Sequence, residues 1–230
     1  MPALSAQREV IAVDLPGFGQ TPPLSGEITI ATLTDAVEEF IAAEHLGDVD
    51  IVGSSMGART VMELARRGHA GTTIALDPGG FWSERQVKIF GLSIKASVGL
   101  VRKIQPALPV LTGNPVGRTA LLAQFSAHPW KLPQNLVLTE LRGFKTSPSL
   151  DAALDSLING PRQQGAPTGS LKGKLAIGWG RQDKVTLPSQ AARAIELFPN
   201  ATLDWFDSCG HFPHWDQPAQ AADFILTNTD

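Results

Sequence analysis

The chain has 230 residues, of which 43% are hydrophobic and 18% charged, a composition that predicts one globular domain with a sizeable core and room for an insertion. The formal net charge is −3 and lysine and arginine do not cluster, which argues against nucleic acid as a partner. Met1–Ser5 does not begin a signal sequence, and no uncharged apolar run is long enough to cross a bilayer. A cytoplasmic protein that does not bind a membrane is therefore predicted.

From the N-terminus to residue 80, short apolar or β-branched runs alternate with segments of helical spacing. In chain order the predicted elements are a strand over Glu9–Asp14, a helix over Ile30–Glu44, a strand over Val49–Val52, a helix over Met56–Arg67 and a strand over Thr72–Leu76. Pro16, Gly17 and Gly19 end the first strand, and Thr32 or Thr34 is the expected N-cap of the first helix. This alternation predicts a parallel sheet.

Between Phe81 and Gly169 the alternation stops, and helix-like segments such as Val87–Ile104 and Arg118–Ser126 are broken by Pro, Gly and Trp. This range predicts an inserted helical lid, or cap, over residues 81–169. The alternation then resumes with a strand over Lys174–Trp179, a helix over Pro188–Leu197, a strand over Thr202–Phe206 and a helix over Pro218–Thr227. The predicted fold class is α/β, with residues 1–80 and 170–230 forming a mainly parallel, doubly wound sheet of about five strands.

The segment Gly53-Ser54-Ser55-Met56-Gly57 lies where a predicted strand gives way to a predicted helix. A serine at such a sharp turn presents its hydroxyl clear of the backbone, and both flanking glycines are expected to let strand and helix approach closely. Gly180-Arg181-Gln182-Asp183 and Ser208-Cys209-Gly210-His211 follow later, each just beyond a predicted strand. This pattern predicts a serine nucleophile that is activated by a histidine and an aspartate.

Four motifs together resemble the α/β-hydrolase superfamily, in its serine-nucleophile branch with a helical lid. They are Asp14-Leu15-Pro16-Gly17-Phe18-Gly19-Gln20-Thr21, the serine segment, Gly178-Trp179-Gly180-Arg181-Gln182-Asp183, and Cys209-Gly210-His211-Phe212-Pro213-His214-Trp215. The resemblance implies that Ser55 is the nucleophile, His211 the general base and Asp183 the carboxylate that orients the imidazole. It also implies that the backbone N–H of Met56 is one donor of the oxyanion hole.

Each assignment has an alternative. Asp77 ends the strand that follows the serine helix and is the alternative acid, while Asp183 is also suited to cap the helix after it. His211 is alternatively a core histidine, with His214 a weaker candidate for the base. No carboxylate or thiolate cluster at ligand spacing accompanies these two histidines, so neither a metal nor a cofactor is expected. The single cysteine, Cys209, excludes an internal disulfide and is expected to be a small apolar filler rather than a nucleophile.

The chain departs from the family at its start. Members normally begin with two or three further strands and a loop, usually carrying His-Gly, that supplies a second oxyanion donor, whereas here Met1–Gln7 resembles the tail of the helix after that loop. In the family's strand order, a strand stands between the one ending at Asp14 and the one ending at Gly53, and it is absent from this sequence. Two hypotheses follow: the chain is an N-terminally shortened form of a longer hydrolase, or the two flanking strands pair directly.

The expected function is hydrolysis of an ester or related acyl bond in a small, largely apolar molecule through an acyl-enzyme, by a monomer or homodimer. Aromatic residues of the lid are expected to line the substrate pocket, namely Phe81, Trp82, Phe90, Phe125 and Trp130. One alternative is a carbon–carbon bond hydrolase or a cofactor-free haloperoxidase with the same triad. The other is a non-catalytic binding protein with the hydrolase fold. Epoxide hydrolases and dehalogenases are disfavoured, since their relatives place an aspartate at the position of Ser55.

Overall fold

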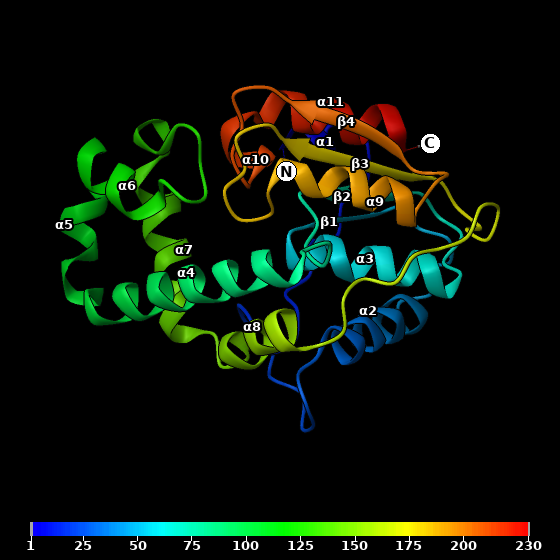
Figure 1. Ribbon diagram of the computed structural model, residues 1–230, viewed down its shortest axis with the longest axis horizontal. Coiled ribbons are helices and arrows are strands. Elements are labelled where there is room, and N and C mark those ends of the chain that lie inside the picture. Colours follow the sequence, from blue (N-terminus) through cyan, green and yellow to red (C-terminus); the bar gives the residue numbers. More distant parts are fainter. Residues whose placement is uncertain (1, 230) are drawn as a thin grey trace.

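The computed structural model describes residues 2–229, and its centre is a parallel sheet of four strands in the order β1-β2-β3-β4 (Figure 1). The strands are β1 (Ile51–Ser54), β2 (Thr73–Leu76), β3 (Leu175–Gly180) and β4 (Thr202–Phe206). Ser54 of β1 lies opposite Leu76 of β2, which in turn lies opposite Gly178 of β3. The strands thus end at one edge of the sheet, the edge where ligands bind in open α/β folds.

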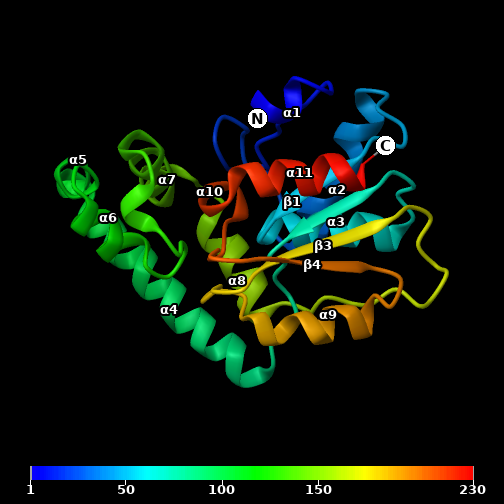
Figure 2. The ribbon, with the colours of Figure 1, turned by 90° about the horizontal axis from the view of Figure 1, so that it is seen from above.

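Helices cover both faces of the sheet (Figure 2). Those of this part of the chain are α1 (Pro2–Ser5), α2 (Ile30–Ala43), α3 (Met56–Arg67), α9 (Ala191–Leu197), α10 (Pro213–Asp216) and α11 (Pro218–Asn228). Met62 of α3 and Phe198 after α9 pack on Ile177 of β3. On the opposite face, Phe224 of α11 packs edge-on against Phe206 of β4. The α/β class and the doubly wound parallel sheet are confirmed.

The strand predicted over Glu9–Asp14 is not present. This segment has no regular secondary structure, and β1 pairs only with β2. Ile11 and Val13 are 49% and 48% exposed, and Val52 on the edge strand β1 is 44% exposed. A β-branched run becomes a strand where a neighbour supplies ladder partners. The prediction of a fifth strand is therefore wrong, and so is the alternative that this run pairs directly with β1.

The N-cap of α2 also differs from the prediction, which sought it at Thr32 or Thr34. The cap is Thr29, whose Oγ1 accepts the N–H of Thr32 at 3.1 Å, while Oγ1 of Thr32 accepts the N–H of Thr29 at 2.9 Å. This reciprocal pair is a capping box in which threonine replaces the usual Glu or Gln at the third helical position. Most other boundaries agree to within a few residues, and α3 and β4 begin and end where the sequence predicts.

Residues 84–159 form five helices, most of which lie at one end of the molecule, beside the carboxyl edge of the sheet, while the last of them lies closer to α2 (Figures 1 and 2). They are α4 (Glu84–Lys103), α5 (Leu108–Thr112), α6 (Pro115–Leu122), α7 (Gln134–Thr146) and α8 (Leu150–Asn159). They share a buried apolar cluster that includes Ile94, Leu122, Leu141 and Leu157. These helices fall within the range 81–169 that the sequence assigns to the lid. No helix in residues 2–229 combines the length and apolar character needed to span a bilayer.

The turn from β1 into α3 contains two glycines with different surroundings. A Cβ on Gly53 would lie 2.2 Å from the carbonyl oxygen of Gly57, so only glycine fits there. A Cβ on Gly57 would meet no atom within 4 Å apart from its own helix backbone and chain neighbours. The expectation that both glycines permit the close approach therefore holds for Gly53 and is wrong for Gly57.

These surroundings predict opposite effects of two alanine substitutions on stability. Gly53→Ala should lower the free energy of unfolding by about 1–3 kcal/mol or more, because the added methyl group overlaps the backbone of α3. Gly57→Ala should leave it unchanged or raise it by up to about 1 kcal/mol, because alanine is the better helix former. Urea unfolding of both variants measures the difference. Equal destabilisation by the two substitutions would contradict this account of the turn.

Candidate active site

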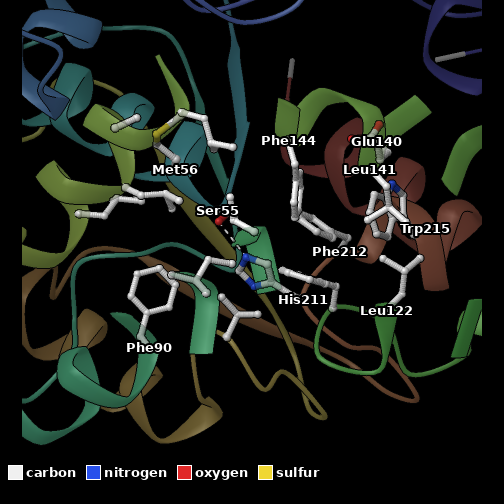
Figure 3. A pocket seen from close by; sticks show the side chains of 18 residues that line it. Ser55, Met56, Phe90, Leu122, Glu140, Leu141, Phe144, His211, Phe212 and Trp215 are labelled. Carbon is white, nitrogen blue, oxygen red and sulfur yellow. Dashed lines mark hydrogen bonds between the residues drawn. The ribbon is translucent and has the colours of Figure 1, made fainter. Parts of the chain in front are cut away.

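Ser55 stands at the turn between β1 and α3, with φ 56° and ψ −112°. A residue other than glycine keeps a positive φ only where its surroundings hold it there. The N–H of Ser55 donates to the carbonyl of Leu76 on β2 at 2.9 Å, and the Ser55 carbonyl accepts the N–H of Arg59 at 3.1 Å. These bonds fix the turn to the sheet and to α3, so the side chain is presented toward the loop after β4 (Figure 3).

His211 lies in the loop after β4 and faces Ser55. Its Nε2 lies 2.8 Å from Oγ of Ser55, and its Nδ1 lies 2.8 Å from Oδ2 of Asp183. The loop is fixed from two sides, because the N–H of His211 donates to the carbonyl of Phe125 at 2.8 Å and a Cβ on Gly180 would lie 2.0 Å from the carbonyl oxygen of Gly210. The imidazole is 1% exposed, so its orientation is set by these partners rather than by water.

Asp183 lies in the loop after β3 and is almost fully buried. Its Oδ1 accepts the N–H groups of Val185 at 2.7 Å and Thr186 at 3.1 Å, and its Oδ2 accepts the hydroxyl of Thr186 at 2.6 Å as well as bonding His211. The carboxyl group thus organises the turn after β3 and contacts the imidazole. The alternative role as a helix cap is wrong, because the helical segments over Pro188–Gln190 and Ala191–Leu197 have no side-chain cap hydrogen bond.

These contacts decide the charge of Asp183. Burial by itself would raise the pKa of this carboxyl group, but the nearby His211 and the hydrogen bonds from His211 and Thr186 outweigh burial and lower the pKa below its usual range. An ionised Asp183 favours the tautomer in which Nδ1 of His211 carries the proton. The Nε2 atom then has a free lone pair directed at the hydroxyl of Ser55, which is the arrangement that a general base requires.

Asp77, the alternative acid, follows β2 and is completely buried. Its Oδ1 accepts the N–H of Gly180 at 2.8 Å, whereas no N–H group of residues 2–229 donates to its Oδ2. Burial, followed by the charge of Asp183, raises the pKa of Asp77 well above its usual range. The hydrogen bond to Nδ1 of His211 comes from Asp183, so Asp77 is better placed to support Asp183 as a neutral acid than to orient the imidazole.

Asp77, Asp183 and His211 also form a group whose ligand-type atoms lie within 4.8 Å of one another, which the sequence did not predict. Nδ1 of His211 is engaged by Asp183, and a carboxyl group with a raised pKa is a poor metal ligand at neutral pH. The group therefore fits proton handling better than cation binding. His214, the weaker candidate for the base, lies in α10, where its ring contacts Phe212 and Trp215 rather than Ser55.

Cys209 is fully buried beside Phe206 and Phe224, in the apolar cluster between the sheet and α11. Burial raises the pKa of its thiol far above the usual range, so the thiolate needed for nucleophilic attack does not form at neutral pH. The expectation that Cys209 is an apolar filler is confirmed.

A cavity of about 180 Å³ opens above Ser55 and His211, between the sheet edge and the helices of residues 84–159 (Figure 3). Its lining is mainly apolar and comprises Ser55, Met56, Phe90, Ile94, Val98, Leu122, Phe125, Glu140, Leu141, Phe144, Leu150, Ala153, Leu154, Leu157, Val185, His211, Phe212 and Trp215. The N–H of Met56 is the first of α3 and has no intrahelical acceptor, so it is free to donate toward an oxyanion bound at Ser55.

Two of the five aromatic residues predicted to line the pocket, Phe90 and Phe125, do so. Phe81 is instead buried against Trp179 and Phe198 beneath the sheet. Trp82 stacks behind Phe90 at 4.8 Å between ring centroids, and Trp130 is 45% exposed beside His128. Composition alone does not reveal which way an aromatic side chain faces.

The lining also contains residues that the sequence analysis missed. Phe212 and Trp215 belong to the same motif as His211, and this proximity in the chain was an available signal. Glu140 and Phe144 lie one helical turn apart on α7, a helix that was not predicted, so no signal pointed to them.

Comparison with known proteins decides the family. The model of the alpha/beta hydrolase family matches residues 1–224. The chain belongs to this family. A 2-hydroxy-6-oxononadienedioate/2-hydroxy-6-oxononatrienedioate hydrolase of Pseudomonas putida is 26% identical over 222 residues, which cover 94% of this chain and 74% of that protein.

Solved hydrolase structures have the same fold. A meta-cleavage product hydrolase from Pseudomonas fluorescens IP01 matches with a TM-score of 0.70 at 19% identity, over 98% of this chain and 81% of that one. A thermophilic esterase from Thermogutta terrifontis matches with a TM-score of 0.68 at 16% identity, over 93% and 76%. The protein is therefore an enzyme of the hydrolase fold, and these relatives span more than one kind of bond cleavage.

The different states of the two buried carboxyl groups lead to a prediction for Asp77→Asn. A carboxyl group whose pKa is raised in the folded state binds more protons there than in the unfolded chain, so its contribution to stability falls as pH rises above about 4. Asparagine does not titrate. The free energy of unfolding of Asp77→Asn minus that of the wild type should therefore increase with pH, by about 1.4 kcal/mol per unit until the folded-state pKa is reached.

Urea unfolding between pH 4 and pH 8 measures this difference. Asp223→Asn, at an exposed position of α11, is the control for removal of a carboxyl group. A pH-independent difference for Asp77→Asn would show that Asp77 is ionised in the folded protein.

Proposed function

We propose that this protein is a serine hydrolase that cleaves an ester or related acyl bond of a small, largely apolar molecule through an acyl-enzyme. The proposal rests on two 2.8 Å contacts, which join Ser55 to His211 and His211 to Asp183. Ser55 and His211 line an apolar cavity, whereas Asp183 lies behind them. Serine is unreactive by itself and needs a base within hydrogen-bond distance, which His211 supplies.

In the proposed reaction, Oγ of Ser55 attacks the substrate carbonyl while Nε2 of His211 accepts the hydroxyl proton. The ionised Asp183 stabilises the imidazolium through Nδ1, and the N–H of Met56 donates to the developing oxyanion. His211 returns the proton to the departing alcohol as the acyl-enzyme forms. A water molecule, deprotonated by the same imidazole, then releases the acid and regenerates Ser55.

A carbon–carbon bond hydrolase is the second candidate, and the name of the Pseudomonas putida relative favours it. The substrate in that name is a dioate and carries two carboxylates. The cavity lining in this chain is mainly apolar and includes neither lysine nor arginine. A doubly anionic substrate would therefore enter without a cationic partner, which favours an uncharged acyl substrate.

The first test is labelling by an active-site fluorophosphonate probe. The wild type should be labelled, and Ser55→Ala should not, with ester turnover reduced by roughly 10⁴-fold or more because the nucleophile is lost. Ser54→Ala is a matched control, because Ser54 is the neighbouring serine on β1 and its hydroxyl has no hydrogen-bond partner in the described chain. Equal labelling of wild type and Ser55→Ala would refute the proposal and favour a non-catalytic protein.

The second test separates the two reactions. The kcat/KM for p-nitrophenyl butanoate should exceed that for a 2-hydroxy-6-oxo-dienoate by about tenfold or more, because the second substrate brings a carboxylate into a lining without cations. Turnover is followed by release of p-nitrophenol and by loss of the dienoate absorbance. Faster cleavage of the dienoate would favour the carbon–carbon bond hydrolase.

A further inference from the structure

Charge is distributed unevenly along the chain. Residues 84–146, which contain helices α4 to α7, include nine basic and two acidic residues and therefore carry a net charge of +7. The whole chain has a net charge of −3, so the remaining residues carry −10. These basic residues form no contiguous run in the sequence, and the total charge hides the difference. The protein thus has one strongly basic end and an acidic body.

The basic end also exposes most of the large apolar side chains that meet solvent. Ten large hydrophobic residues of the described chain are exposed, and six of them lie between residues 84 and 146, namely Ile89, Leu92, Leu100, Val110, Val116 and Trp130. A single exposed apolar residue is ordinary, whereas a concentration of them in one part of the molecule indicates a surface that binds something apolar.

Both features meet on one side of α4, which Figure 2 shows along the rim of the molecule. At about 100° per residue, the exposed side chains fall within an arc of roughly 140°. This outer face of α4 consists of Arg85, Lys88, Ile89, Leu92, Lys95, Ala96, Leu100 and Lys103. Leu92 lies near its centre and is 75% exposed. Glu84, the first residue, is the only acid of the helix.

The basic side chains of this face are mostly unpaired. Lys95 lies 3.8 Å from Asp155. No acidic side chain within residues 2–229 forms a salt bridge with Arg85, Lys88 or Lys103. Their charges are therefore available to an anionic partner.

A lipid surface with anionic headgroups complements this face in both respects. Leucine and isoleucine side chains can enter the boundary between headgroups and acyl chains, while lysines beside them attract phosphate or carboxylate groups. A symmetric dimer through α4 would instead place the lysines of two copies against each other. A helix that lies in the interface does not cross the bilayer, so it needs no spanning length.

We propose that the outer face of α4 attaches the protein to an anionic lipid surface. The opposite expectation, that the protein binds no membrane, follows from a total charge that averages two unlike ends. The other side of α4 lines the cavity through Phe90, Ile94 and Val98. Attachment would therefore hold the cavity about one helix diameter, roughly 10 Å, from the lipid. The inference concerns binding and does not depend on the proposed reaction.

Co-sedimentation with vesicles tests the inference. The full chain carrying Ser55→Ala, in which lipid turnover by Ser55 is not possible, is mixed with vesicles of phosphatidylcholine alone or with about 30% phosphatidylserine. Partitioning onto the anionic vesicles should exceed that onto the neutral ones by about tenfold or more. It should also fall as the salt concentration is raised, because exposed charges are screened.

Substitutions on the outer face of α4 should weaken binding to the anionic vesicles. Lys88→Glu and Lys103→Glu should each lower partitioning by about fivefold or more, since attraction to the headgroups becomes repulsion. Leu92→Ser should lower it by about tenfold at unchanged net charge, because an apolar side chain no longer enters the interface. All three positions are exposed, and thermal unfolding checks that each variant folds.

Matched controls lie away from the basic end. Lys172→Glu makes the same charge change at an exposed position before β3, at the edge of the sheet opposite the site. Ile11→Ser removes an exposed apolar side chain from the N-terminal segment. Both should leave partitioning within about twofold of the parent, because charges beyond a Debye length of the lipid are screened and Ile11 does not enter it.

Three results would overturn the inference. They are equal partitioning onto neutral and anionic vesicles, no partitioning onto either, and equal effects of the α4 and control variants. Self-association without lipid that Leu92→Ser or Lys103→Glu abolishes, measured by analytical ultracentrifugation, would assign the face to a second copy and overturn it as well. Failure of the proposed function has a separate signature, which is unlabelled Ser55 and no ester turnover, whatever the vesicle binding.

Discussion

The parallel sheet is the constraint on which the site depends, because it brings the ends of distant segments to one edge. Ser55 follows β1, Asp183 follows β3 and His211 lies in the loop after β4, so residues more than 150 positions apart meet within hydrogen-bond distance. The close approach of Gly180 to Gly210 then brings the two loops together, since a side chain at Gly180 would overlap the backbone. The relative positions of these three side chains are thus determined mainly by how the backbone packs at the sheet edge.

Electrostatics divides the work between two buried carboxyl groups. Asp183 accepts two backbone N–H groups, a hydroxyl and the imidazole, whereas Asp77 accepts one backbone N–H through Oδ1. The number of donors determines which group stays ionised, because burial disfavours both charges and only hydrogen bonds and the neighbouring imidazole offset it. The same sheet edge can therefore supply an anion for His211 and a neutral acid beside it, with no difference in residue type.

The sequence predicted those features that depend on local pattern. The helix after Ser55, the strand over Thr202–Phe206 and the order of Ser55, Asp183 and His211 follow from apolar periodicity and glycine-rich turns. Glu9–Asp14 has the composition of a strand, yet strand formation depends on a neighbouring strand that local sequence does not describe. The lining of the cavity was mostly missed for a related reason, since Phe81 and Phe90 look alike in sequence and differ only in which surface they face.

The residues that the sequence predicted and those that it missed thus belong to different parts of the site. The sheet positions Ser55, Asp183 and His211, and proteins that resemble this chain at identities near 26% or below are named for different reactions. Most of the cavity lining comes instead from helices α4, α6, α7 and α8, and it is mainly apolar. A substitution among these apolar side chains changes the shape of the cavity, whereas the contacts that join Ser55, His211 and Asp183 are made at the sheet edge.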